Sequence, residues 1–142
     1  MPTTPGDAHA LAIYTELRRA LHHGARTAHL LRHAPDLIDL ITPPRDHPLV
    51  ATIDRAKRTE HLIRRAIHDL GAPLDHVAEI LFTLAAGMDI PLEHRRAHAA
   101  AYLGIQPDTL RKEWQDHILW DITIEIYNHT QPDQSPGHHQ AA

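Results

Sequence analysis

The amino-acid sequence predicts an all-α protein, a single compact domain of about six helices with a helix-turn-helix near its C-terminal end. Three observations lead to this prediction. Apolar residues recur every three or four positions along most of the chain. Prolines stand where these periodic segments begin, and glycines stand where several of them end. Aromatic residues make up 4 % of the chain and apolar residues 42 %, so we expect a core of Leu, Ile and Ala.

The first part of the chain predicts one helix of ordinary length and two shorter pieces. Residues 1–7 contain prolines and a glycine, and we expect them to be flexible. A first helix is expected over about 8–23, because an apolar row leads up to Gly24, where a C-terminal glycine belongs. The members of that row are Leu11, Tyr14, Leu17 and Leu21. A second helical patch follows at 28–31, and Pro35 opens a third that two adjacent prolines end.

A long helix is expected next, over about 48–70, closed by Gly71. Glu60 interrupts its apolar row. The side opposite that row carries the basic residues Arg55, Lys57, Arg58, Arg64 and Arg65. Such a side is either an ordinary solvated surface or a basic surface that flanks a phosphate backbone.

Three further helices are expected over about 73–85, 91–103 and 107–128, each opened by a proline. In the last of them, three isoleucines alternate with polar residues as they would in a strand, namely Ile122, Ile124 and Ile126. The unbroken helical lead-in favours a helix there. The helical domain is therefore expected to span 8–128, and the polar, proline-containing segment 129–142 is expected to be a disordered tail.

The most specific stretch of the chain is the helix-turn-helix pattern at 91–114. Ala99 and Ala100 are small enough to let a second helix cross close to the first. Gly104 tolerates the positive φ that the turn requires, and Leu110 then points inward. These residue types are steric necessities of the motif, so they predict its architecture independently of what the second helix contacts.

The end of the motif departs from the usual pattern. An apolar residue is expected where Glu113 stands, and Trp114 comes one residue later. Either the second helix does not end as the usual pattern has it, or Trp114 packs at a slightly rotated position.

The same stretch resembles a known pattern, R-R-x-x-A-A-x-x-L-G-x-x-x-x-T-x-R. The residues that carry the match are Arg95, Arg96, Ala99, Ala100, Leu103, Gly104, Thr109 and Arg111. It is similar to helix-turn-helix and winged-helix regulators, including mercury-resistance-type regulators and excisionases. It resembles still more closely small all-helical modules of actinobacteria, in which an apolar helix follows. The resemblance covers 91–127 and implies DNA binding, as in the regulators, or interaction and signalling, as in the modules.

If DNA is the partner, the second helix of the motif would enter the major groove. The residues expected to contact DNA are Arg95, Arg96, Gln106, Thr109, Arg111 and Lys112. Arg95 and Arg96 would face the phosphate backbone. Arg111 could read guanine, and Gln106 could read adenine or touch phosphate. The leading interpretation is a DNA-binding transcriptional regulator.

The charge of the motif keeps a second interpretation open, a protein-interaction or signalling adaptor module with the same fold. Between Glu93 and Glu113, four Arg or Lys residues face three acids, a net charge of +1. Asp108 and Glu113 lie on the very helix that should meet phosphates. The whole chain carries −4 with its 15 histidines neutral, which is unusual for a strong nonspecific DNA binder.

Other function classes find little support. There is no cysteine, the one serine is Ser135, and no glycine-rich loop could cradle a phosphate, so no enzyme is expected. Histidines four residues apart, such as His94 and His98, are expected by chance at this abundance, so neither a metal site nor another cofactor is predicted. No membrane-spanning run or secretory signal is seen, and we expect a cytoplasmic protein.

The last helix also bears on association. Its apolar residues fall on more than one face, and they are Ile118, Leu119, Trp120, Ile122, Ile124, Ile126 and Tyr127. Either this helix crosses the centre of the domain, or part of it forms the contact of a symmetric homodimer.

Overall fold

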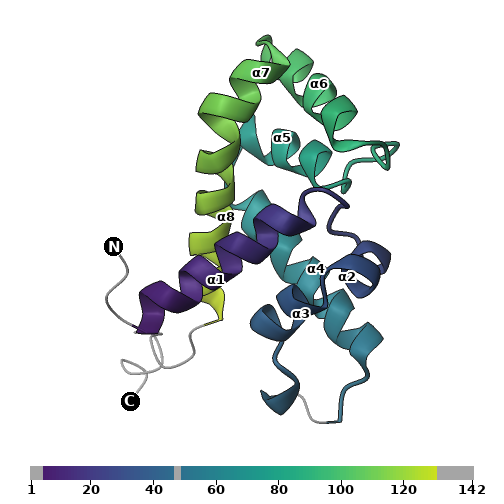
Figure 1. Ribbon diagram of the computed structural model, residues 1–142, viewed down its shortest axis with the longest axis vertical. Helices are drawn as coiled ribbons and strands as arrows, with labels where there is room; N and C mark the ends of the chain where they lie inside the picture. The colour runs from purple at the N-terminus through teal and green to yellow at the C-terminus, as the bar shows by residue number, and fades with distance from the viewer. Residues whose placement is uncertain (1–4, 47–48, 131–142) are drawn as a thin grey trace.

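The computed structural model describes residues 5–46 and 49–130, and these residues are helical without any β-strand among them (Figure 1). The elements in chain order are α1 (Pro5–Ala20), α2 (Thr27–His33), α3 (Pro35–Ile41), the 3₁₀ turn η1 (Pro44–Asp46), α4 (Thr52–His68), α5 (Leu74–Leu81), α6 (Leu92–Leu103), α7 (Pro107–Thr109), the π-helical turn η2 (Leu110–Trp114) and α8 (Gln115–His129). The prediction of an all-α domain is confirmed.

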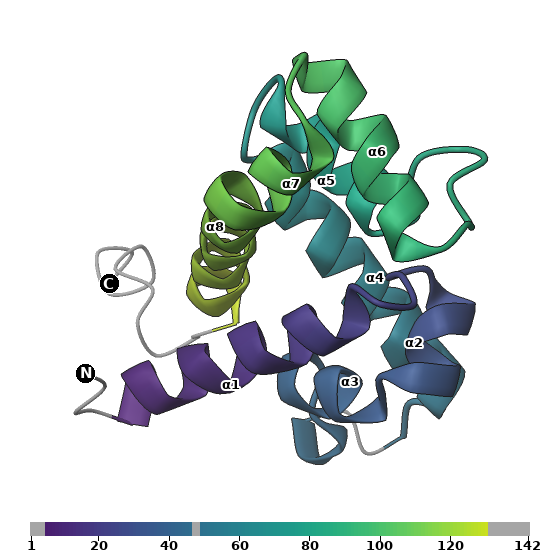
Figure 2. The ribbon, with the colours of Figure 1, turned by 45° about the horizontal axis from the view of Figure 1, so that its top comes forward.

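The helices pack as two groups, α2 with α3 and α5 with α6 and α7. The helices α1, α4 and α8 join the two groups (Figures 1 and 2). The helix α1 runs across the middle of the molecule and contacts α3 and α8. The helix α4 contacts α2 and α3 at one end and α5 and α8 at the other. The helices α5, α6 and α7 form the second group, at the end of the molecule that carries the helix-turn-helix.

The core between these groups is aliphatic, as the composition predicts. Its fully buried side chains include Ile13, Leu17, Leu30, Ile63 and Leu110, and Phe82 is the largest apolar one. Among the described residues, no helix combines the length and apolar character needed to cross a bilayer.

The first helix differs from its expected bounds at both ends. It begins at Pro5, so residues 5–7 are helical and not flexible as expected; residues 1–4 lie outside the described part of the chain. It ends at Ala20, before a turn in which Gly24 has a φ of 115°. The backbone N–H of Ala25 then donates to the carbonyl of Phe82 at 2.8 Å, which ties this turn to the end of α5.

Two polar residues of α4 have structural roles that the sequence pattern does not reveal. Arg55, expected on the solvated side, is 8 % exposed, and its Nη1 donates to Asp39 Oδ1 and to the carbonyl of Thr42, each at 3.0 Å. Glu60, which interrupts the apolar row, accepts hydrogen bonds from the backbone N–H and the hydroxyl of Thr27 at 2.6 and 2.8 Å. Glu60 therefore supplies from α4 the N-terminal cap that α2 lacks in its own sequence.

The C-terminal half follows the prediction with shifted ends. The helix α5 stops at Leu81, short of the expected 85, and Thr83 beyond it has a positive φ of 64°. The isoleucines that alternate near the C-terminus lie in α8, as preferred over a strand. Within the tail expected at 129–142, His129 still belongs to α8 and Thr130 is its C-cap, and 131–142 lies outside the described residues.

Candidate functional site: a basic pocket at the helix-turn-helix

The helix-turn-helix forms as its steric features predict. Gly104 ends α6 in the left-handed region with φ 74° and ψ 31°. Ala99, Ala100 and Leu110 are each 0 % exposed where the two helices meet, and the backbone N–H of Ile105 donates to the carbonyl of Ala100 at 3.0 Å. The turn is therefore fixed by the backbone and by close packing of small side chains.

A π-helical turn explains why the end of the motif departs from the usual pattern. The backbone N–H of Gln115 donates to the carbonyl of Leu110, five residues earlier, so η2 contains one more residue than an α-helical turn. The buried face therefore continues from Leu110 to Gln115, which is 9 % exposed, while Trp114 is 37 % exposed and Glu113 is exposed as well. Such π turns are found frequently at functional sites.

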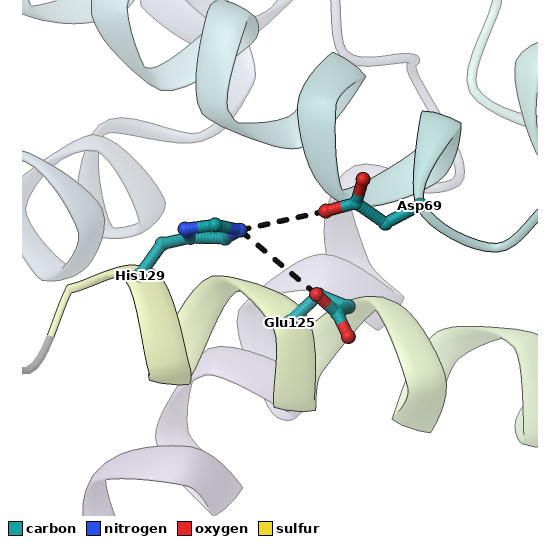
Figure 3. Close-up of side chains that lie close together, drawn as sticks. All are labelled: Asp69, Glu125 and His129. Atoms are coloured by element: carbon teal, nitrogen blue, oxygen red, sulfur yellow. Dashed lines mark hydrogen bonds and ion pairs between the residues drawn. The ribbon is translucent and has the colours of Figure 1, made fainter. Parts of the chain in front are cut away.

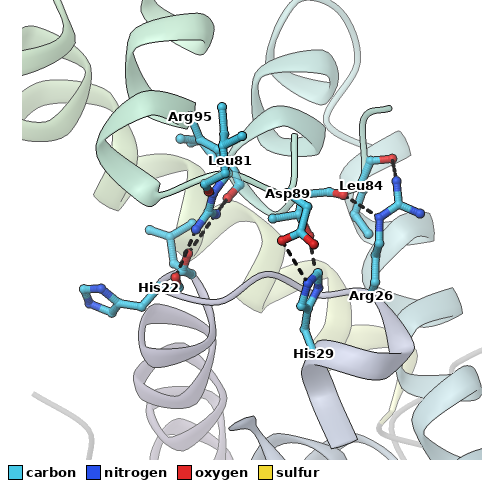
Figure 4. A network of polar contacts seen from close by, with 10 residues as sticks. His22, Arg26, His29, Leu81, Leu84, Asp89 and Arg95 are labelled. Carbon is cyan, nitrogen blue, oxygen red and sulfur yellow. Dashed lines mark hydrogen bonds and ion pairs between the residues drawn. The ribbon is translucent and has the colours of Figure 1, made fainter. Parts of the chain in front are cut away.

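Arg95 does not face outward, and the prediction that it contacts a DNA backbone is wrong. Its side chain is 1 % exposed and its guanidinium donates only to backbone carbonyls, at the ends of α1 and α5 and in the loop before α6 (Figure 4). The acceptors are Ile90 at 2.8 Å from Nε, Leu21 at 2.9 Å from Nη1, Leu81, also from Nη1, and His22 at 3.0 Å from Nη2.

This arrangement makes Arg95 a structural cation. The C-terminal ends of helices carry partial negative charge and unsatisfied carbonyls, both of which the guanidinium compensates. Burial lowers the pKa of Arg95 and the carboxylate of Asp89 raises it. The group nonetheless remains protonated, because arginine is not deprotonated in proteins.

Arg96, its neighbour, is only partly buried and points toward η2 and α8. Its Nε donates to Gln115 Oε1 at 2.8 Å. Desolvation lowers the pKa of Arg96, and the positive charge of Arg111 lowers it further. The guanidinium groups of Arg96 and Arg111, one from each helix of the motif, are thus held near each other. The hydrogen-bond partner of Arg96 is the neutral amide of Gln115.

These groups line a pocket of about 490 Å³ between α1 and the helix-turn-helix, which we name the basic pocket. Its lining residues are Tyr14, Arg18, Leu21, His22, Arg96, Arg111, Lys112, Gln115 and Asp116. Four of them are Arg or Lys and one is an acid. That acid, Asp116, accepts a hydrogen bond from the hydroxyl of Tyr14. Four cations against one carboxylate give the pocket a net positive charge.

The cations at the outer end of the basic pocket share one surface carboxylate. Asp108 lies 2.7 Å from Nη2 of Arg111 and 3.0 Å from Nζ of Lys112, and all three side chains are about half exposed or more. Hydrogen bonds from Arg111 and Lys112 hold the pKa of Asp108 below its ordinary value. Exposed ion pairs of this kind contribute little free energy, so a stronger anion could displace the carboxylate.

The remaining predicted site residues lie outside the basic pocket. Gln106 is exposed at the N-cap of α7, and Thr109 is half-buried at the end of the same short helix. The structure therefore brings together Arg96, Arg111 and Lys112 and places the other two at the turn.

Sequence reasoning missed the contribution of α1, which adds Arg18 and His22 to the pocket. Arg18 directly follows the buried Leu17 in sequence, but nothing local indicates which later helix it meets. The packing of α1 against α8, together with the hydrogen bonds from Arg95 to the carbonyls of Leu21 and His22, brings these residues beside the motif.

Four cations around a pocket of this size suit a phosphate or another oxyanion, since guanidinium groups bind two such oxygens at once and lysine adds a point charge. No family model, curated protein or solved structure matches the chain.

Proposed function

We propose that the protein binds duplex DNA through its helix-turn-helix, with a backbone phosphate held in the basic pocket. The observation that carries this proposal is the convergence of Arg18, Arg96, Arg111 and Lys112 from three separate elements onto one pocket beside the motif. A helix-turn-helix needs phosphate contacts at this place, because they fix how the second helix is seated in the groove.

The electrostatics of the pocket favour an anion. The charge of Arg111 depresses the pKa of Arg96, which means that the two cations repel each other in the absence of a ligand. Gln115 binds Arg96 without cancelling its charge. A phosphate between these groups would relieve the repulsion and would replace the weak surface pairs with Asp108.

The predicted residues would have two roles, contact with the DNA backbone and reading of the bases. Arg96, Arg111 and Lys112 would contact the backbone and supply affinity, which is independent of sequence. Gln106 and Thr109 lie at the start of the second helix, where base edges are read in this class of motif. Transcriptional control is the function that fits such a protein, as the resemblance to helix-turn-helix regulators implies.

Fluorescence anisotropy with mixed genomic fragments, at low and moderate salt, tests the proposal. Arg111→Ala combined with Lys112→Ala should weaken binding and lower the slope of log K against log salt by about two, one for each lost contact. Lys57→Ala combined with Arg65→Ala is the matched control, because it removes the same charge from exposed positions on α4. Absence of salt-dependent binding would reject DNA as the partner. Equal effects of the two double variants would reject the basic pocket as the place where the phosphate is held.

A protein partner is the second candidate, and the aromatic surface of the motif favours it. Tyr102 on α6 is 50 % exposed and Trp114 on η2 is 37 % exposed, and exposed aromatic residues are enriched in protein interfaces. The same titration separates the candidates. If a variant with both Tyr102→Ala and Trp114→Ala binds DNA as tightly as the unmodified chain, these two aromatic residues have no role in DNA binding.

A homodimer through α8 is likewise a proposal. The structure buries Ile118, Leu119, Ile122 and Ile126 within the domain, and it leaves Ile124 47 % exposed. A dimer contact on this helix would therefore be centred on Ile124. Sedimentation velocity at micromolar concentration tests it, and a monomer at that concentration would exclude it.

A further inference from the structure

We propose that Asp69, Glu125 and His129 form a binding site for a divalent transition-metal ion, with Zn²⁺ as the best fit. The three side chains point toward one another where the end of α4 meets the end of α8 (Figure 3). No metal site was expected from the sequence, because the spacing of histidines along the chain concerns only residues close together in sequence. This cluster draws its ligands from two helices far apart in the chain.

The donor atoms already lie near the positions that a metal would require. Nε2 of His129 is 3.5 Å from Oδ2 of Asp69 and 3.9 Å from Oε2 of Glu125. One donor atom from each residue lies within 4.8 Å of the other two. Ligands of tetrahedral zinc are separated by roughly 3.3 Å, the edge of a tetrahedron with bonds of about 2.0–2.1 Å. Shifts of under about one ångström in the side chains would bring both distances from His129 to this value.

The backbone holds these residues in place without an ion. Glu125 and His129 are one turn apart on α8, so their side chains lie on the same face of that helix. Asp69 is the C-cap of α4, which packs against α8. Ordering of the site therefore needs only side-chain adjustment, and the entropic cost of forming it is small.

The charge around the site favours a cation. A hollow of about 260 Å³ beside it is lined by Asp69, Leu70, Asp121, Ile124 and Glu125, with three carboxylates and neither Lys nor Arg. Asp121 also lies 3.9 Å from Nε2 of His117, one turn before it on the same helix. The open hollow gives room for water or a fourth ligand, which a metal bound by three protein ligands keeps.

The donor set selects among cations. One imidazole with two carboxylates is a borderline set that suits Zn²⁺ and similar ions, whereas Ca²⁺ and Mg²⁺ prefer oxygen ligands alone. Without a metal, His129 would be attracted to both carboxylates when protonated.

Calorimetric titration of the full chain with ZnCl₂ at pH 7.5 tests the site. The unmodified chain should show one tight class of site, and Asp69→Asn combined with Glu125→Gln should weaken that class at least tenfold, the usual scale for loss of metal ligands or their partners. The control is His23→Ala combined with His33→Ala, which removes the stacked histidine pair elsewhere on the surface, with ring centroids 3.7 Å apart. This control should keep the tight class.

Two further measurements keep the test decisive. Circular dichroism establishes whether each variant is folded. If the double variant is unfolded, His129→Ala removes a metal ligand in its place. Cobalt(II) should give a visible ligand-field spectrum with the unmodified chain that is lost in His129→Ala. Equal zinc binding by the chain and its ligand variants, loss of the tight class in the His23 and His33 control, or equally tight binding of Mg²⁺ would each overturn the proposal. None of these readouts involves DNA, so the outcome is independent of the proposed function.

Discussion

The guanidinium of Arg96 donates a hydrogen bond from Nε to Oε1 of Gln115 at 2.8 Å, and this bond joins the two helices of the helix-turn-helix. The π-helical turn is what directs Gln115 toward Arg96, because without the extra residue of η2 the buried face would continue through Trp114. The bond orients Arg96 beside Arg111 and leaves the charge of both intact. The bond that joins the two helices thus also positions a cation of the basic pocket.

Replacing the neutral partner by an acid should therefore impair DNA binding without unfolding the chain. In Gln115→Glu, the new carboxylate would form an ion pair with Arg96 and compete with phosphate for it. We expect weaker binding and a salt slope reduced by about one contact, measured by anisotropy at several salt concentrations. Asn128→Glu is the control, since it adds the same charge at the exposed far end of α8. Identical titrations for the two variants would contradict a phosphate-binding role for the pocket.

Arg95 should matter for stability. In Arg95→Met, the carbonyls of Leu21, His22, Leu81 and Ile90 lose their buried donor. Each unsatisfied acceptor costs about 1–3 kcal/mol, part of which water recovers, so we expect a loss of roughly 3–5 kcal/mol in the free energy of unfolding. Urea unfolding followed by circular dichroism measures it. Arg96→Met, which loses one partly exposed bond, should cost about 0.5–1.5 kcal/mol, and equal losses for both variants would disprove the distinction.

The two adjacent arginines also show how far the sequence could predict the site. The helix-turn-helix could be predicted because its requirements are local: a residue that tolerates positive φ at Gly104 and small residues before it. Arg95 and Arg96 could not be told apart, since neighbours on a helix point about 100° apart and only the packing of α1 and α5 decides which is buried. For the same reason, the part of Arg18 in the basic pocket could not be foreseen.

Two glycines with positive φ should respond differently to substitution. Gly104 has a φ of 74° and nothing within 4 Å of an added Cβ, so Gly104→Ala should cost only the left-handed backbone penalty of about 1–2 kcal/mol. At Gly24, a Cβ would come within 2.3 Å of Thr83 Oγ1 and 2.8 Å of His29 Nδ1. Gly24→Ala should therefore cost about 1–3 kcal/mol more, the usual price of overpacking. Thermal or urea unfolding of both variants checks the order, and a milder effect at Gly24 would refute the close approach of this turn to the end of α5.

Glu60 should make the stability of the domain sensitive to acid. Burial would raise the pKa of Glu60, but hydrogen bonds from Arg64 and Thr27 outweigh it and hold the pKa below its ordinary value. A carboxyl group whose pKa is lower in the folded than in the unfolded chain stabilises the fold above the unfolded pKa, and this contribution is lost as the pH falls through the folded pKa. The stabilisation is therefore complete above about pH 5 and fades in more acidic solution.

Glu60→Gln removes this titration together with part of the cap of α2. At pH 7 we expect a loss of about 1–2 kcal/mol in the free energy of unfolding, the scale of a lost N-cap or charged hydrogen bond. The loss should shrink as the pH is lowered from about 5, because Glu60 of the unmodified chain then becomes protonated and its carboxylate no longer stabilises the fold. Urea unfolding at a series of pH values measures the two curves. Glu93→Gln is the control: this side chain is 81 % exposed, and its curve should run parallel to that of the unmodified chain. A difference between Glu60→Gln and the unmodified chain that stays constant down to pH 3 would show that the carboxylate of Glu60 caps α2 without any linkage to its charge.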